Sequence, residues 1–279
     1  MKEILLPYYN DRKGKTINTL VIHASAQHTS DALMAKLIER ELSSHYLVDE
    51  KGEITRMVPE ACRAWHAGVG EWMGDKDLNS TSIGIEMCNG LFGEEPFSDK
   101  QISSLIELCQ HLIDKYDIAP TQVIGHSDLA PNRKIDPGSM FPWQKLAENG
   151  VGLWYDIKQG QELTTLTPEQ LLKGIGYGTD NLEASEWAFC RHFNPSLYRF
   201  LGGKSGANKG TIEGLVLHDN PEYLRTLKAV HSAYCQSRLQ QMEEAGNFMP
   251  HEVNLKASGG AVFHSGLWFG WRKAASNRF

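Results

Sequence analysis

The sequence lacks any long apolar run. No stretch of its 279 residues approaches the roughly 20 apolar residues that a membrane-spanning helix needs. The first ten residues hold only one short apolar stretch, residues 4–7, which is too brief for the core of a signal peptide. As it stands the chain is therefore predicted to be cytoplasmic, with no transmembrane segment. If a leader has been removed, a periplasmic or cell-envelope location is expected instead.

Cysteine is scarce and positive charge is not in surplus. The five cysteines are irregularly spaced with no CxxC pair, which disfavours a disulfide framework or a thiolate zinc site. A net charge of −6 and a pI of about 6.0 argue against a nucleic-acid partner, which would need a basic surface. The sequence also contains no HExxH motif, which removes the commonest class of zinc peptidase.

What is present predicts an α/β fold. Apolar patterns predict strands or a hairpin in four segments: residues 16–24, 43–58 (the hairpin), 82–88 and 122–126. Helices are expected behind an N-cap at Ser30 and behind a capping box that opens at Ser98. Strands that alternate with helices, plus one hairpin, predict a mixed β-sheet flanked by helices.

The pattern changes after Trp154, where a polar stretch of weak periodicity begins. The predicted division is a catalytic domain over 1–155, a linker over 156–165 and a smaller helical domain over 166–279. Helices are expected in three segments of this second half: one opening at Thr167 and Pro168, residues 184–193 and residues 221–245.

Two further features of the second half are expected to be structural. Trp268, Phe269 and Trp271 lie at near-helical spacing, which favours a core over a sugar-stacking surface. Its histidines show no metal-ligand spacing, and all five are expected to be structural: His192, His218, His231, His251 and His264.

Three residues of the first half could form a metal site. His23 closes the first predicted strand, His126 closes the last, and Asp136 lies ten residues further on. Two imidazoles and one carboxylate form a common catalytic zinc set that leaves a fourth position open for water. By spacing alone, each histidine could equally be a core residue, and Asp136 before Pro137 could be a turn former.

Four motifs occur in a fixed order along the first half: LVIHAS, AWHAG, SIGIEMCNG and GHSDLAPNRKIDPG, at residues 20–25, 64–68, 82–90 and 125–138. Together they resemble the type 2 N-acetylmuramoyl-L-alanine amidases, whose fold is shared with T7 lysozyme and the peptidoglycan recognition proteins. The resemblance covers about residues 5–155. The continuation at 141–154 resembles the envelope-associated branch typified by AmiD, and the cytosolic recycling branch typified by AmpD is the nearer alternative.

The resemblance implies zinc-dependent hydrolysis of the amide bond between N-acetylmuramic acid and L-alanine, in peptidoglycan or muropeptides. It implies that His23, His126 and Asp136 hold the zinc ion. It also implies that Glu86 is the general base and that Lys134 stabilises the oxyanion. Taken as bare residues, Glu86 could lie on the polar face of a half-buried strand and Lys134 in a solvated loop.

Four residues are predicted to contact substrate: Trp65, His66, Tyr46 and Asn89. Envelope-branch amidases carry a helical domain thought to bind peptidoglycan, and the second half is weakly similar to it. The alternative is a non-catalytic peptidoglycan-recognition module of the same fold. Such proteins lose zinc ligands, whereas all three ligand positions are present here. The sequence leaves open the oligomeric state and the choice between recycling and wall lysis.

Overall fold

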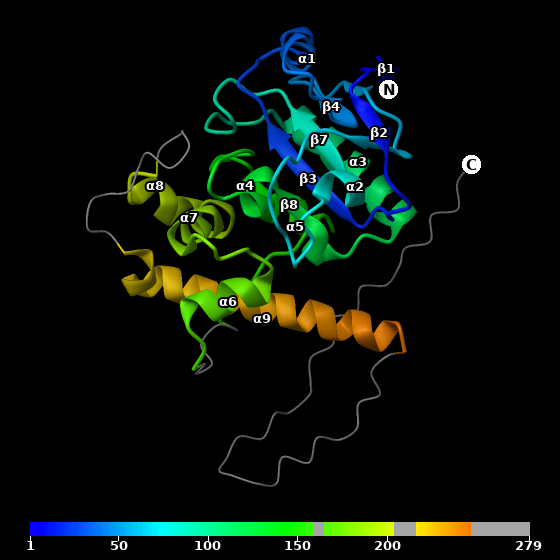
Figure 1. Cartoon of the computed structure of the whole chain (residues 1–279). Helices are drawn as coiled ribbons and strands as arrows, with labels where there is room; N and C mark the ends of the chain where they lie inside the picture. The colour runs from blue at the N-terminus through cyan, green and yellow to red at the C-terminus, as the bar shows by residue number, and fades with distance from the viewer. Residues whose placement is uncertain (159–164, 204–215, 247–279) are drawn as a thin grey trace.

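The computed structural model describes residues 1–158, 165–203 and 216–246 (Figure 1). A mixed sheet lies at the centre, with helices on both of its faces. The predicted aromatic cluster at Trp268, Phe269 and Trp271, and the histidines His251 and His264, lie outside the described residues. Among the described residues, no helix is both long and apolar enough to cross a membrane.

The main sheet has six strands in the order β1-β5-β4-β7-β3-β8. Only the β4–β5 hairpin is antiparallel, and the other neighbours pair in parallel. A second, two-stranded sheet pairs β2 with β6. The strands are β1 (Lys2–Glu3), β2 (Tyr9–Asp11), β3 (Thr19–Ala24), β4 (Tyr46–Val48), β5 (Ile54–Arg56), β6 (Cys62–Ala64), β7 (Ser82–Met87) and β8 (Val123–Gly125).

The register of the two central strands decides which side chains share a face. Strands β3 and β7 pair with Val21 opposite Gly84 and His23 opposite Glu86. Side chains alternate between faces along a strand, so His23 and Glu86 project on the same side. The residues between them, such as Ile22 and Ile85, join an apolar cluster on the other face. One face of the sheet is thus fully apolar and the other carries the polar chemistry.

Helices cover the two faces differently. The apolar face packs against α3 (Asp99–Tyr116) and α5 (Trp143–Glu148), whose buried residues include Leu105, Cys109 and Leu146. The polar face is bordered by α1 (Ser30–Glu39), which packs on Leu47 of β4. The short helices of the first half are α2 (Leu78–Thr81), η1 (Pro120–Gln122) and α4 (His126–Leu129).

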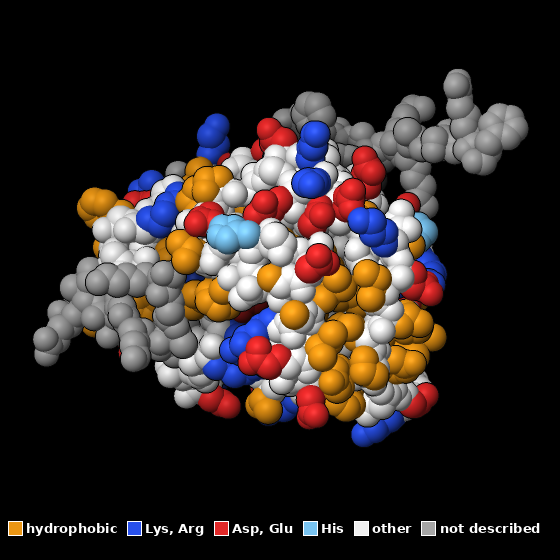
Figure 2. All heavy atoms as spheres, turned by 90° about the horizontal axis from the view of Figure 1, so that it is seen from above, with side chains coloured by type: hydrophobic (Ala, Val, Ile, Leu, Met, Phe, Trp, Pro, Cys, Tyr) orange, Lys and Arg blue, Asp and Glu red, His pale blue; other side chains and the backbone are white. Residues whose placement is uncertain are grey.

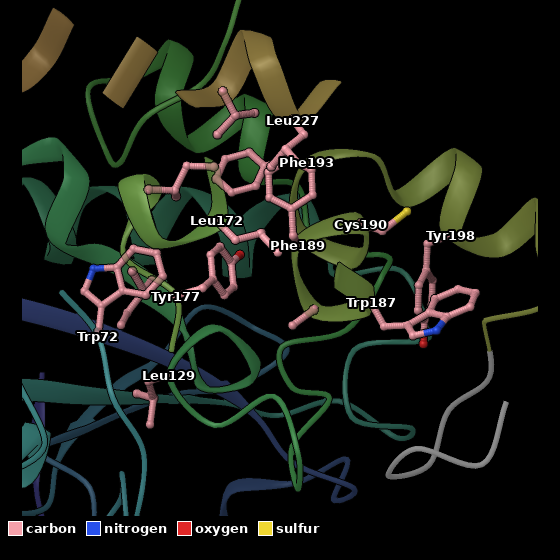
Figure 3. Packing of buried hydrophobic residues seen from close by; sticks show 14 of the residues in the cluster. Trp72, Leu129, Leu172, Tyr177, Trp187, Phe189, Cys190, Phe193, Tyr198 and Leu227 are labelled. Carbon is pink, nitrogen blue, oxygen red and sulfur yellow. The ribbon is translucent and has the colours of Figure 1, made fainter. Parts of the chain in front are cut away.

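The helices of the second half share a core with the sheet. Figure 3 shows Trp72 and Leu129 of the first half beside Tyr177, Phe189 and Phe193 of the second, all within one buried cluster. Figure 1 shows these helices gathered at the end of the molecule opposite α1. They are α6 (Pro168–Ile175), α7 (Leu182–Phe193), α8 (Pro195–Phe200), η3 (Leu217–Asp219) and α9 (Pro221–Glu244). The predicted division at 156–165 stays a prediction, but the two halves pack as one body.

Most predicted elements form close to their expected bounds, with two differences. Thr29, not Ser30, caps α1, because its side chain accepts from the Ala32 amide. His126 does not end a strand: β8 stops at Gly125 and His126 begins α4. Several short elements were not predicted from the sequence, among them β1, β2, β6, α2, α5 and α8.

Charge is mixed over the α1 end of the molecule. Figure 2 looks onto this end and shows acidic and basic side chains interspersed, with exposed apolar side chains most numerous at the lower right and fewer on the left. The five cysteines are all free, as their spacing predicted, and three of them are buried: Cys88, Cys109 and Cys190.

Candidate metal centre and active site

The structure brings the three predicted metal ligands together. The Nδ1 atoms of His23 and His126 lie 2.9 Å apart, and Asp136 Oδ2 lies 3.4 Å and 3.1 Å from them respectively. All three side chains are buried. Among the described residues, this is the one group of three or more ligand-type side chains that could hold a metal ion.

The donor set fits a zinc ion. Zinc bonds to imidazole and carboxylate are about 2.0–2.2 Å long, so two ligand atoms of a tetrahedral site lie roughly 3.3 Å apart. The three observed separations, 2.9, 3.1 and 3.4 Å, are close to that spacing. Burial and the neighbouring His126 lower the pKa of His23 to about 4, which leaves a neutral ring with a lone pair to offer.

The second ring nitrogen of each histidine ligand also has a partner. His126 Nε2 lies 3.0 Å from the carbonyl oxygen of Ala67, and His23 Nε2 lies 2.9 Å from His66 Nδ1. A metal-binding histidine usually donates its other N–H in this way, which fixes the orientation of the ring. The segment that supplies both partners is the AWHAG motif.

The loop that carries Asp136 is fixed by close backbone packing. The Ser127 amide, one residue after His126, donates to the carbonyl oxygen of Asp136 at 2.8 Å. On the other side of the loop lies Gly93, at φ +85°, where an added Cβ would fall 1.4 Å from the Pro137 carbonyl oxygen. The chain at 93 can therefore approach the ligand loop only as glycine.

Glu86 faces the same space from β7. It is 9% exposed and lines a pocket together with the three ligands. Burial, with the negative charge of Asp136 nearby, raises the pKa of Glu86 to about 8, against the opposing effect of Lys134. A carboxyl group held in this range can both accept and return a proton.

Lys134, two positions before Asp136, also lines the pocket. The remaining wall comes largely from α1 and the turn that follows it, which the sequence did not single out. Two cationic side chains lie on this wall, Arg40 and Lys36, and Lys36 is paired with Glu39 at 2.8 Å. Their only sequence signal was their place on the polar side of a predicted helix.

The four predicted substrate residues divide into two pairs. Trp65 and His66 line the pocket. Tyr46 lies on the opposite, apolar face of the sheet, where its hydroxyl donates to Glu60. Asn89 is used within its own loop, accepting from the Leu91 and Gly93 amides. Tyr46 and Asn89 are therefore not part of the pocket lining.

Comparison with known proteins agrees with this site. A family model described as N-acetylmuramoyl-L-alanine amidase matches residues 13–139, a span that contains every pocket residue discussed above. The amidase AmiD of Escherichia coli K12 is 38% identical over 212 residues, covering 65% of this chain and 76% of that protein. The chain belongs to the N-acetylmuramoyl-L-alanine amidase family. The predicted family membership and fold are both confirmed.

Other members of the amidase family match to different extents. The amidase AmpD of Haemophilus influenzae is 39% identical over 112 residues, covering only 40% of this chain and 60% of that protein. A structure of E. coli AmiD, in complex with anhydro-N-acetylmuramic acid-L-Ala-D-gamma-Glu-L-Lys, superposes with a TM-score of 0.64 at 31% identity. That match covers 84% of this chain and 93% of the AmiD chain, so it extends into the helical half.

Proposed function

We propose that this amidase hydrolyses the bond between N-acetylmuramic acid and L-alanine in peptidoglycan or muropeptides, using a zinc ion held by His23, His126 and Asp136. The observation that carries the proposal is the convergence of the buried ligand cluster, Glu86 and Lys134 on one pocket. The substrate is supported by the AmiD structure, whose bound ligand is an anhydromuramyl peptide.

The proposed chemistry divides among residues by charge. A bound zinc ion would supply Lewis acidity and lower the pKa of a water molecule toward neutrality. Glu86 takes a proton from the attacking water and passes it to the leaving L-alanine amine, a role that suits its raised pKa. The ammonium of Lys134 stabilises the negative charge that develops on the lactyl carbonyl oxygen.

The low exposure of these groups strengthens the proposal. His23, His126, Asp136 and Glu86 are each no more than 9% exposed. Charges near buried groups are screened less by solvent than charges in bulk water, which favours an interaction between the part-buried Lys134 and a developing oxyanion. Trp65 supplies an apolar wall beside them, suited to a sugar or peptide face.

The test is cleavage of an anhydromuramyl tripeptide by the full chain, followed by mass spectrometry with and without a chelator. Release of anhydro-N-acetylmuramic acid and free tripeptide, abolished by chelation and restored by Zn²⁺, is expected. Glu86→Gln should lower turnover by about 10²–10⁴-fold while zinc content is unchanged. Glu107→Gln, an exposed carboxylate on α3, is the matched control and should leave turnover unchanged.

The opposite outcome has a clear meaning. A zinc-loaded chain that binds the anhydromuramyl peptide without cleaving it would instead be a recognition module of the same fold. Binding of peptidoglycan by residues 166–279, and the location of the chain in the cell, stay predictions.

A further inference from the structure

His66 contacts a metal ligand from outside the ligand set. Its Nδ1 lies 2.9 Å from His23 Nε2, and its Nε2 lies 3.2 Å from the hydroxyl of Ser82. The two imidazole rings meet edge to face, with centroids 5.0 Å apart. Ser82 in turn donates to the carbonyl oxygen of Leu78. These contacts form a continuous chain from a backbone carbonyl to His23.

The direction of every hydrogen bond in this chain can be deduced from its far end. The closer of the two contacts of the Ser82 hydroxyl is the one with Leu78, whose carbonyl oxygen can only accept, so the single hydroxyl proton is directed to Leu78. Ser82 Oγ must then accept from His66, which places the His66 proton on Nε2. His66 Nδ1 is left with a lone pair that accepts from His23.

This hydrogen bond sets the tautomer of the metal ligand His23. With its proton on Nε2, the neutral ring of His23 presents an unprotonated Nδ1, and this is the atom that faces His126 and Asp136. The other tautomer of His23 would place a proton where the metal must bind. The second ligand is fixed more simply, since His126 Nε2 faces the carbonyl oxygen of Ala67 directly.

The position of His66 is itself tightly held. The amides of His66 and Ala67 both donate to Asn79 Oδ1, at 3.0 Å and 2.8 Å. The ring lies directly on strand β7, where a Cβ added at Gly84 would fall 2.6 Å from His66 Cγ and Nδ1. One two-residue segment therefore supplies the partner of each histidine ligand, a side chain for His23 and a carbonyl for His126.

We propose that the Leu78 carbonyl, acting through Ser82 and His66, fixes His23 in the tautomer that binds the metal. His66 and Ser82 are thus positioning residues, and the proposal rests on the metal site of the proposed function. Partners of this kind typically change metal affinity by 10–100-fold when they are removed.

The direct test needs no substitution. Long-range ¹H–¹⁵N spectra of the metal-free full chain distinguish the two tautomers of a neutral histidine by the shifts of its ring nitrogens. The expected result is a protonated Nε2 and an unprotonated Nδ1 for His23 and His66. A proton on Nδ1 of His23 or His66 would overturn the proposal.

Zn²⁺ affinity, measured by competition with a chromophoric chelator, gives a second readout. Ser82→Ala leaves the His66 Nε2–H without its acceptor, so the Kd for Zn²⁺ should rise about tenfold. Ser103→Ala, at an exposed position of α3, is the control and should not change the Kd. An unchanged Kd in Ser82→Ala, with a wild-type amide spectrum, would refute the relay.

A pair of substitutions at His66 separates hydrogen bonding from packing. Asn places an oxygen near the position of Nδ1 and can still accept from His23, whereas Leu cannot. The Kd for Zn²⁺ should rise about 10–100-fold in His66→Leu and substantially less in His66→Asn. Equal losses in both would contradict the acceptor role. None of these measurements uses hydrolysis, so failure of the amidase proposal would be seen separately, as a zinc-binding chain that does not cleave muropeptide.

Discussion

Two buried histidine–carboxylate clusters lie two residues apart on α4, and they differ in how their polar atoms are used. The first, the His23 cluster, consists of His23, His126 and Asp136. The second, the Asp128 cluster, consists of Asp128 with His192 and Tyr177. Asp128 Oδ2 accepts from the Gly125 amide and from His192 Nδ1, each at 2.7 Å, and Oδ1 accepts from the Tyr177 hydroxyl at 2.7 Å. The same residue types thus serve two purposes within one turn of helix.

The Asp128 cluster is satisfied internally. Both carboxylate oxygens have donors, and the His192 ring stacks between Trp143 and Phe193, with centroids 3.9 Å from each. The His23 cluster instead points three acceptor atoms at one another beside an open pocket. Buried acceptors without donors are unfavourable unless something positive joins them. The comparison shows that a cluster's function depends on whether its lone pairs are already occupied.

The largest expected effect comes from removing a ligand of the unsatisfied cluster. Asp136→Ala should reduce bound zinc from about one ion per chain to none, because two imidazoles alone hold zinc weakly. Zinc content after dialysis, measured by mass spectrometry, checks this. Asp128→Asn should retain its zinc in the folded protein. Loss of zinc from both variants would contradict the claim that only the first cluster binds the ion.

Next in size is the effect of the pocket lysine. Lys134→Ala should lower kcat on an anhydromuramyl peptide by about 10²–10³-fold, the usual effect of losing one oxyanion partner, with zinc content unchanged. Lys134→Arg keeps the charge and should recover part of the rate. Lys100→Ala, exposed on α3, serves as the control. A kcat for Lys134→Ala within twofold of wild type would remove the residue from the mechanism.

The satisfied cluster should show its effect in stability. Asp128→Asn replaces Oδ2 with an amide that faces two donors, so it should lower the free energy of unfolding by about 3 kcal/mol. Urea denaturation measures the change. Asp114→Asn, an exposed residue on α3, should shift stability by less than about 0.5 kcal/mol. Equal stability of the two variants would mean that the hydrogen bonds of Asp128 to Tyr177 and His192 do not stabilise the packing of the two halves.

A third carboxylate, that of the partly exposed Glu60, also has donors for its oxygens. Glu60 accepts from Lys115 and from the hydroxyls of Tyr116 and Tyr46. Burial alone would raise the pKa of Glu60, but these three donors outweigh it and lower the pKa from 4.5 to about 2. The folded state therefore gains stability above about pH 4.5, and it loses this gain as the pH falls through about 2.

The corresponding variant tests that pH dependence. At pH 7 Glu60→Gln should be about 2 kcal/mol less stable than wild type, after allowance for partial exposure. The difference should shrink steadily as the pH falls from 4.5 toward 2, which chemical denaturation at several pH values will follow. A difference that stays constant with pH would mean that the lost contacts are not ionic.

The sequence by itself predicted the main strands and helices and, through the resemblance of its motifs to a family, the candidate site residues. Apolar runs located β3 and β7, a capping box with an apolar stripe of helical period located α3, and a helical stretch over 221–245 located α9, because such patterns depend only on neighbours along the chain. The four ordered motifs pointed to the ligand set and to Glu86 and Lys134. The structure gathers these residues, whose assigned roles stay proposals.

Only the tertiary structure decided the rest. It placed Tyr46 on the far face of the sheet, because strand register, not proximity in sequence, sets which way a side chain points. It packed Trp72 against Tyr177 and joined the helical half to the sheet. It also gave the donor and acceptor order of the hydrogen bonds that link His23 through His66 and Ser82 to the Leu78 carbonyl oxygen. That order depends on which acceptor lies at hydrogen-bonding distance, and no one-dimensional pattern records it.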